Sequence, residues 1–332
     1  MRVAAIDCGT NSIRLLIADQ VVDEAAESEV LVDVLRRSEV VRLGQGVDTS
    51  GRLAPEALAR TLDMCREYAQ ECRHHGVEPG RVRFVATSAS RDASNADEFV
   101  AGVREAFGEL DVSPEVVPGT EEAALSFAGA TSGLLEAGFE GPYLIADIGG
   151  GSTEIVRGTH EVVAGTSFDI GSVRLTERHH RTDPPTQEVI DAARFDIAEA
   201  LDEAEALVGL GGVATVVGLA GSVTTVAALA LELTSYDRAA IHLARIPIEE
   251  MMTACERLIL STRAERAAQP FMHPGRVDVI GAGALIWWEI LERARGANGP
   301  DLVVTVSERD ILDGIAMSIV RPPVVEDEPT AG

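Results

Sequence analysis

The chain has 332 residues, of which 46% are hydrophobic and 25% are charged, so it is long enough to form two domains with separate cores. Its formal net charge of −26 argues against nonspecific binding of nucleic acid, which needs a basic surface. All 28 basic residues are Arg, and the absence of Lys excludes the GxxxxGK[ST] phosphate loop of nucleotide-hydrolysing proteins.

The first third of the chain predicts strands followed by helices. Short runs rich in Val, Ile and Leu, separated by turn residues, predict strands at 2–7, 13–18, 29–36 and 82–87. Apolar side chains at helical spacing predict a helix over 54–75 that ends at Gly76. Two further helices are predicted, one from Ser94 or Asn95 to about Phe107, and one from Glu121 to about Glu136 with Thr120 as its N-cap.

The remainder of the chain repeats this mixture of elements, which is typical of the α/β class. Strands are predicted at 143–147, 153–157, 161–167, 213–217 and 302–306, and helices at 186–208, from Ser222 to 231, 248–260, 275–295 and 307–320. The uncharged segment 206–231 is interrupted by five glycines, so we interpret it as a buried strand, turn and helix rather than a membrane span. The Pro-rich acidic tail 321–332 is predicted to be disordered.

Two segments of the chain repeat the same pattern. Asp7 and Asp147, 140 residues apart (147 − 7), each end an apolar strand and precede a turn rich in Gly, Ser, Thr or Asn. Such turns expose backbone N–H groups and hydroxyls that can bind phosphate, and a carboxylate at the strand end can supply an oxygen to Mg²⁺. The same offset places Arg14 opposite Glu154, so only the second copy brings a carboxylate to this position. The repeat predicts two related domains that bind one phosphate-bearing ligand between them.

A third glycine turn, 218–222, makes the pattern similar to the actin, sugar-kinase and Hsp70-type ATPase superfamily. Five segments narrow the resemblance to the exopolyphosphatase and guanosine-pentaphosphate phosphatase family: 7–12 (DCGTNS), 42–46 (RLGQG), 87–91 (TSASR), 119–123 (GTEEA) and 147–154 (DIGGGSTE). This resemblance implies two ribonuclease H-like (actin-like ATPase) domains with mixed sheets and an interdomain cleft. We expect the domains at 1–124 and 125–320, with a final helix that can pack back on the first domain.

The resemblance also implies a reaction and its residues. Members of the family use Mg²⁺ to hydrolyse the terminal phosphoryl group of inorganic polyphosphate, or the 5′ γ-phosphate of guanosine pentaphosphate. The second Glu of G-x-E-E-A, here Glu122, is the family's catalytic base, and its apolar neighbours favour the raised pKa that a base needs near neutrality. Glu154 is expected to orient the attacking water or to bind Mg²⁺ together with Asp7 and Asp147. The phosphate-binding candidates are Gly9, Thr10, Asn11, Ser12, Arg91, Gly149, Gly150, Gly151, Ser152, Gly221 and Ser222.

Several alternatives stay open at this stage. A structural role is an equal alternative for Arg91, and Arg276 to Asp278, which resembles the family's R-A-D-V segment, is expected to form a structural ion pair. Ala124 replaces the family's usual Arg, which puts the processive degradation of long chains in doubt. The substrate could be polyphosphate or guanosine pentaphosphate, or the chain could be a catalytically weak sensor of either. Transfer of phosphate to a sugar is disfavoured, because Glu122 is the evident base.

Two further expectations concern the setting of the protein. The four cysteines have no paired spacing and no leader peptide is recognised, so we expect reduced thiols in a cytoplasmic protein. No membrane or nucleic-acid partner is expected. Family members often pair, and the apolar 275–295 segment could serve as the interface of a homodimer.

Overall fold

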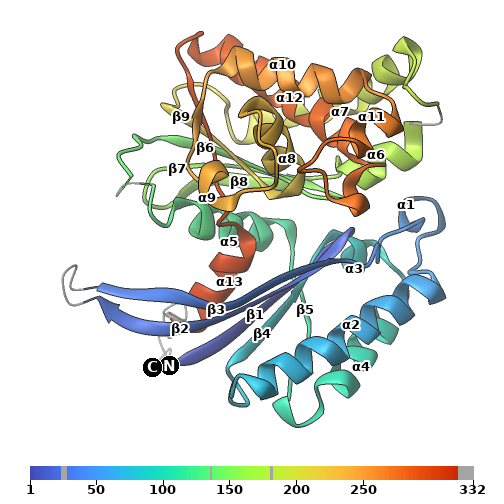
Figure 1. The fold of residues 1–332 in the computed structure, drawn as a ribbon, viewed down its shortest axis with the longest axis vertical. Helices are drawn as coiled ribbons and strands as arrows, with labels where there is room; N and C mark the ends of the chain where they lie inside the picture. The colour runs from blue at the N-terminus through green and yellow to red at the C-terminus, as the bar shows by residue number, and fades with distance from the viewer. Residues whose placement is uncertain (24–27, 135–136, 180–181, 321–332) are drawn as a thin grey trace, which may run out of the picture.

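Two lobes, each built on one mixed sheet, make up the computed structural model, which describes residues 1–23, 28–134, 137–179 and 182–320 (Figure 1). The first sheet has the order β3-β2-β1-β4-β5 and the second has the order β10-β11-β9-β6-β7-β8. The strands of the first sheet are β1 (Arg2–Cys8), β2 (Ser12–Asp23), β3 (Ser28–Val40), β4 (Val82–Ala86) and β5 (Glu115–Val116). Those of the second are β6 (Tyr143–Ile148), β7 (Thr153–Gly158), β8 (Val162–Phe168), β9 (Thr215–Leu219), β10 (Arg245–Ile246) and β11 (Val303–Val306).

The two sheets share one topology. In the first, β1 is antiparallel to β2 and parallel to β4, and in the second β6 is antiparallel to β7 and parallel to β9. The order β8-β7-β6-β9-β11 therefore repeats β3-β2-β1-β4-β5, and β10 is added at the edge. This is the ribonuclease H-like arrangement present twice, so the expected fold class is confirmed.

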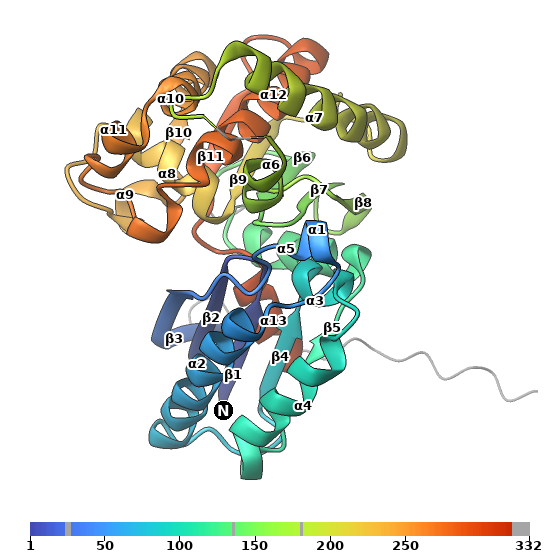
Figure 2. The same cartoon turned by 90° about the vertical axis from the view of Figure 1, so that its right-hand side faces the viewer.

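Helices cover both faces of each sheet (Figures 1 and 2). One face of the first sheet packs on α2 (Pro55–His74) and α4 (Ala96–Phe107), and one face of the second packs on α7 (Gln187–Leu207), α8 (Ala220–Ala230), α10 (Ile248–Leu260) and α12 (Ile280–Asn298). The opposite faces are covered by α13 (Ile311–Val320) on the first sheet and α5 (Gly119–Thr131) on the second. The shorter helices are α1 (Val47–Ser50), α3 (Ser88–Asp92), α6 (Ser172–His179), α9 (Arg238–Ile241) and α11 (Arg263–Ala267), with 3₁₀ turns at Gly108–Leu110 and Pro274–Arg276.

The two inner helices, α5 and α13, cross each other between the lobes (Figure 1). Their backbones touch at two glycines: a Cβ at Gly129 would lie 1.8 Å from the carbonyl oxygen of Asp310, and one at Gly314 would lie 2.0 Å from that of Leu125. The expected domain division after residue 124 falls inside α5, which contacts both α13 and the second sheet.

Several expected boundaries were wrong. Helix α5 begins at Gly119 with Pro118 as the capping residue, so Thr120 lies inside the helix. Helices α12 and α13 begin at Ile280 and Ile311, later than predicted, because a 3₁₀ turn and a side-chain-bonded loop precede them. The predicted end of the 121–136 helix and the predicted tail 321–332 lie outside the described residues.

Candidate functional site

The repeated Asp–glycine turns occupy equivalent places in the two sheets. In the strand registers Asp7 faces Arg14, and Asp147 faces Glu154, as the sequence offset indicates. Both turns are closed by the same hydrogen bond, 3.0 Å long, from Gly9 N–H to the carbonyl of Ser12 and from Gly149 N–H to the carbonyl of Ser152. The duplication therefore extends from the sequence to the backbone of the site.

In the first turn the carbonyls are held by the 41–44 loop. The N–H groups of Val41 and Arg42 donate to the carbonyl of Asn11 at 3.1 and 2.8 Å, and Gly44 N–H donates to that of Thr10 at 2.9 Å. In a planar trans peptide the N–H points opposite to the carbonyl. The N–H groups of Asn11 and Ser12 consequently point away from the loop, and both residues line the cleft between the lobes.

In the second turn the carbonyls are held by the start of α6. The carbonyl of Gly149 accepts from Ser172 N–H at 3.0 Å, and that of Gly150 accepts from the N–H groups of Val173 and Arg174 at 2.8 and 3.1 Å. Arg174 Nε donates to the Gly151 carbonyl at 2.6 Å. The N–H groups of Gly150, Gly151 and Ser152 have no acceptor within the described part of the chain, so they form a concave set of donors suited to an anion.

The two turns pack directly against each other. A Cβ at Gly151 would lie 2.5 Å from Thr10 Oγ1 and 2.7 Å from Ser88 Oγ, so glycine is required for this approach. Between them lies a small cavity of about 110 Å³. The residues expected from the sequence that line it are Asp7, Gly9, Thr10, Asn11, Ser12, Glu122, Asp147, Gly149, Gly150, Ser152, Glu154, Gly221 and Ser222. Gly151 and Arg91 lie outside the lining, although both contact residues of the site.

Glu122 enters the cavity from the first turn of α5. It is 6% exposed, and its Oε2 accepts from Arg91 Nη1 at 2.9 Å, while the same Nη1 donates to the carbonyl of Val117 at 3.2 Å. Burial raises the pKa of Glu122 to about 7, helped by the negative charges of Asp7 and Asp147 and opposed by Arg91. A carboxyl with this pKa is suited to accept a proton near neutrality.

Asp147 and Glu154, which face each other on the two strands beside the second turn, each accept a hydrogen bond from a serine hydroxyl. Ser126 on α5 donates to Asp147 Oδ2 at 2.7 Å, and Ser167 on β8 donates to Glu154 Oε1 at 2.6 Å. Burial raises the pKa of Asp147 to about 7, and the negative charge of Asp310 adds to this rise. Burial also raises the pKa of Glu154 well above its usual range, helped by the charges of Glu122 and Asp147.

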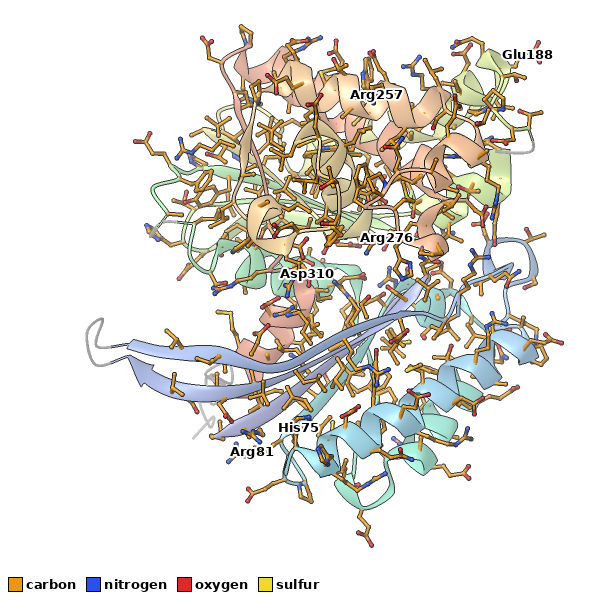
Figure 3. The ribbon with its side chains drawn as sticks, viewed as in Figure 1. His75, Arg81, Glu188, Arg257, Arg276 and Asp310 are labelled. Carbon is orange, nitrogen blue, oxygen red and sulfur yellow. The ribbon has the colours of Figure 1, made fainter. Side chains whose placement is uncertain are left out.

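Asp7 is paired with Arg14, which the sequence reasoning placed in the turn without a role. Arg14 Nε donates to Asp7 Oδ2 at 2.8 Å, and Arg14 also pairs with Asp310 ahead of α13. Burial raises the pKa of Asp7, and the guanidinium of Arg14 opposes that rise. Asp310 lies at the contact between the lobes (Figure 3), so Arg14 links the first turn to the start of α13.

The third glycine turn brings in Arg276, a residue that we expected to be structural. Arg276 lines the cleft and lies against Gly221, where a Cβ would approach its guanidinium carbon to 2.4 Å (Figure 3). Asp278 instead accepts from Arg42 and Arg263, at 3.1 and 2.7 Å. Ala220, which precedes Gly221 in the third turn, has a φ of 64°, a strained value for a residue with a side chain.

The residues of the cavity fit a divalent cation that is held partly by the protein and partly by a bound phosphate and water. Mg²⁺ prefers oxygen ligands and usually keeps several waters besides one or two carboxylates and phosphate oxygens. Asp7, Asp147 and Glu154 supply buried carboxylates whose pKa values are raised, and a cation would stabilise their charged forms. Within the described ranges no three His, Cys, Asp or Glu side chains could hold an ion by themselves. Phosphate oxygens and water would have to complete the coordination.

The fold and the site together define a two-lobed protein whose cleft combines buried carboxylates with backbone donors suited to phosphate. A family model described as the Ppx/GppA phosphatase family matches residues 20–298. The chain belongs to this family, as the sequence motifs indicated. Among the described residues no helix has both the length and the hydrophobicity needed to cross a membrane.

Individual relatives agree with this assignment over nearly the whole chain. Exopolyphosphatase 2 of Mycobacterium tuberculosis is 52% identical over 320 residues, which cover 96% of this chain and 98% of the relative. A solved exopolyphosphatase-like protein is 44% identical with a TM-score of 0.88, covering 96% of this chain and 97% of the other. The Aquifex aeolicus member of the Ppx/GppA family is 30% identical with a TM-score of 0.75, covering 97% and 98%.

Proposed function

We propose that this chain is an exopolyphosphatase, which hydrolyses the terminal phosphoryl group of inorganic polyphosphate and releases orthophosphate. The observation that carries the proposal is the position of Glu122, which faces the same small cavity as both N–H-bearing turns and has a pKa of about 7. The 52% identity to Exopolyphosphatase 2 supports the choice of substrate.

The residues of the chain divide the chemistry between them. The N–H groups of the two turns would bind the oxygens of the terminal phosphate, where negative charge is spread during phosphoryl transfer. Glu122 would accept the proton of the attacking water, and Arg91 would hold the carboxylate in place while it does so. Glu154, on β7, would orient that water. A Mg²⁺ ion beside Asp7 and Asp147 would neutralise charge on the phosphate oxygens.

Replacement of Glu122 by Gln tests the proposal. Because Gln keeps the size of the side chain but cannot accept the proton, we expect phosphate release from polyphosphate to fall by about 10²–10⁴-fold while binding persists. The neighbouring Glu121 provides the matched control, since it pairs with Arg83 at 2.6 Å and is 41% exposed. Glu121→Gln should stay within about twofold of the parent. Unchanged turnover in Glu122→Gln, or an equal loss in both variants, would refute the role of Glu122.

A second substrate, guanosine pentaphosphate, is favoured by a larger neighbouring cavity of about 500 Å³. This cavity shares Arg14, Gly221 and Arg276 with the small one, so the two are continuous. Its lining also includes arginines that are ion-paired with acidic residues, two acidic residues, and aromatic or apolar side chains: Arg36, Arg37, Arg238, Glu308, Asp310, Tyr236, Phe271 and Met272. Such a lining would suit a nucleoside that carries further phosphates.

Phosphate release measured side by side from polyphosphate and from guanosine pentaphosphate decides between these substrates. A higher kcat/KM on polyphosphate supports the primary proposal, and a higher value on the nucleotide supports the second. Tight Mg²⁺-dependent binding of both without release would identify the chain as a sensor instead.

A further inference from the structure

We propose that Arg174 is a positioning residue for the second phosphate-binding turn, which it holds through the Gly151 carbonyl while anchored on the opposite lobe. Its Nε donates to the carbonyl of Gly151 at 2.6 Å, which completes the set of three turn carbonyls held by donors from α6. Arg174 lies outside the lining of the cavity, so it acts on the turn and not on the substrate. This inference rests on the proposed function, because it assigns a role to the turn in binding phosphate.

The same guanidinium is anchored on the opposite lobe. Arg174 Nη1 donates to Asp48 Oδ1 of α1 at 2.6 Å, and Nη2 donates to Asp92 at the end of α3. Within its own lobe Asp169 lies 3.5 Å from Nη2. The Arg174 side chain is only 10% exposed, so these charge-assisted bonds are little screened by water. A forked guanidinium is the side chain that can serve three separate acceptors at once.

The consequence for the turn follows from peptide geometry. Fixing the Gly151 carbonyl toward Arg174 also fixes the Ser152 N–H in the opposite direction, because the peptide is planar. Ser152 lines the cavity, and its N–H has no acceptor within the described part of the chain. The direction of this donor is therefore set from the first lobe, through Asp48 and Asp92.

One segment of the first lobe thus supports both phosphate turns. Residues 41–44 hold the carbonyls of the first turn through backbone N–H groups, and Asp48, a few residues later, holds the second turn through Arg174. Glu177 strengthens the same contact, because its two carboxylate oxygens each accept from Gly46 N–H at 3.2 Å. The turns are set for phosphate together, when the lobes are in contact.

Arg178 provides a matched control for this proposal. It lies one helical turn after Arg174 and also reaches Asp48, through Nε at 2.6 Å and Nη2 at 2.8 Å, but its other partner is Asp196 and not the turn. Replacing Arg178 therefore weakens the contact between the lobes while leaving the Gly151 carbonyl in place. Arg174→Lys keeps a positive charge near the aspartates but removes the Nε donor, and it serves where Arg174→Ala fails to fold.

The experiment measures kcat and KM for phosphate release, the Kd for tripolyphosphate by calorimetry, and the melting temperature, for the parent and for Arg174→Ala, Arg174→Lys and Arg178→Ala. We expect Arg174→Lys to lower kcat by about tenfold or more and to weaken tripolyphosphate binding at a melting temperature near that of the parent. Arg178→Ala should stay within about twofold in kcat and Kd.

Two results would overturn the proposal: kcat and Kd of Arg174→Lys within twofold of the parent, or equal losses in Arg178→Ala. A parent that binds tripolyphosphate but releases no phosphate from any substrate would refute the proposed function alone. In that case the Kd values of the variants still test the role of Arg174.

Discussion

The crossing of α5 and α13 makes Gly314 a position where one added methyl group should strongly destabilise the fold. A Cβ at Gly314 would lie 2.0 Å from the carbonyl oxygen of Leu125, whereas ordinary contact begins at 3.4 Å. The obstructing atoms are the backbone of α5, so no rotamer change can relieve the clash. Gly314→Ala must therefore push the two helices apart by more than an ångström.

The cost of that displacement should be about 3 kcal/mol, at the upper end of what overpacking costs, because α13 also carries the core on one face of the first sheet. The displacement should lower activity as well, since α5 holds Glu122 in the cavity. Urea unfolding followed by circular dichroism measures the change in the free energy of unfolding, and phosphate release measures the change in activity.

Gly296→Ala is the control, because this glycine lies in α12 and no atom would lie within 4 Å of a Cβ added there. In an open helical position Ala is favoured over Gly by about 0.5–1 kcal/mol, so this variant should be slightly more stable than the parent. A Gly314→Ala protein within about 1 kcal/mol of the parent would show that the helices are free to separate, and the role given to their crossing would be wrong.

Three further predictions concern the site itself. Glu122 must be deprotonated to act as a base, and its pKa is raised to about 7. We therefore expect kcat/KM to fall about tenfold per pH unit below pH 7 and to level off above it. A profile that is flat down to pH 5 would contradict this. The same raised pKa has the opposite effect on stability. Between pH 4.5 and about 7 the folded state binds the proton of Glu122 more tightly than the unfolded state does. The free energy of unfolding, measured without divalent cations, should therefore decline as pH rises through this window. Ala220→Gly should stabilise the chain by about 0.5–1 kcal/mol. The αL conformation at φ 64° costs Ala about 1–2 kcal/mol, and the greater freedom of glycine in the unfolded state offsets part of the gain from removing that cost. A melting temperature below that of the parent would refute the strain.

The sheets were predictable from the sequence because their signal is local. Runs of Val, Ile and Leu place β1, β4, β6 and β7 within a residue or two, and the constant offset between Asp7 and Asp147 indicated the duplication. The identity of Glu122 came from the family resemblance, since a Glu in the first turn of a helix is explained equally well by the helix dipole.

The residues that the sequence reasoning missed act through tertiary contacts. Helix α6 was not predicted, because it has only eight residues, of which Val173 and Leu175 alone are apolar, and it is ordered by donating hydrogen bonds to the carbonyls of the glycine turn. Arg14 and Arg276 reach the cavity from β2 and from the 3₁₀ turn before α12. The sequence marked Arg14 only as the counterpart of Glu154 and Arg276 only as a structural residue, and their positions in the cavity depend on the fold. The glycines of the α5 and α13 crossing are likewise indistinguishable from turn glycines without the fold.

The duplicated halves share the backbone of their turns but differ in the residue that faces the Asp, and under the proposed function this difference would place the reaction in the second half. In the first half Arg14 neutralises Asp7, so that strand pair offers binding without an unpaired carboxylate. In the second half Asp147 and Glu154 face each other and accept from serine hydroxyls, and within the described residues no guanidinium hydrogen bonds to either carboxylate. Glu122 reaches this acidic side from α5, the helix that crosses α13 between the lobes. A change in the angle between the lobes would therefore move Glu122 relative to the two turns. Under the proposed function, hydrolysis would then depend on a lobe geometry that phosphate binding by one half would not need.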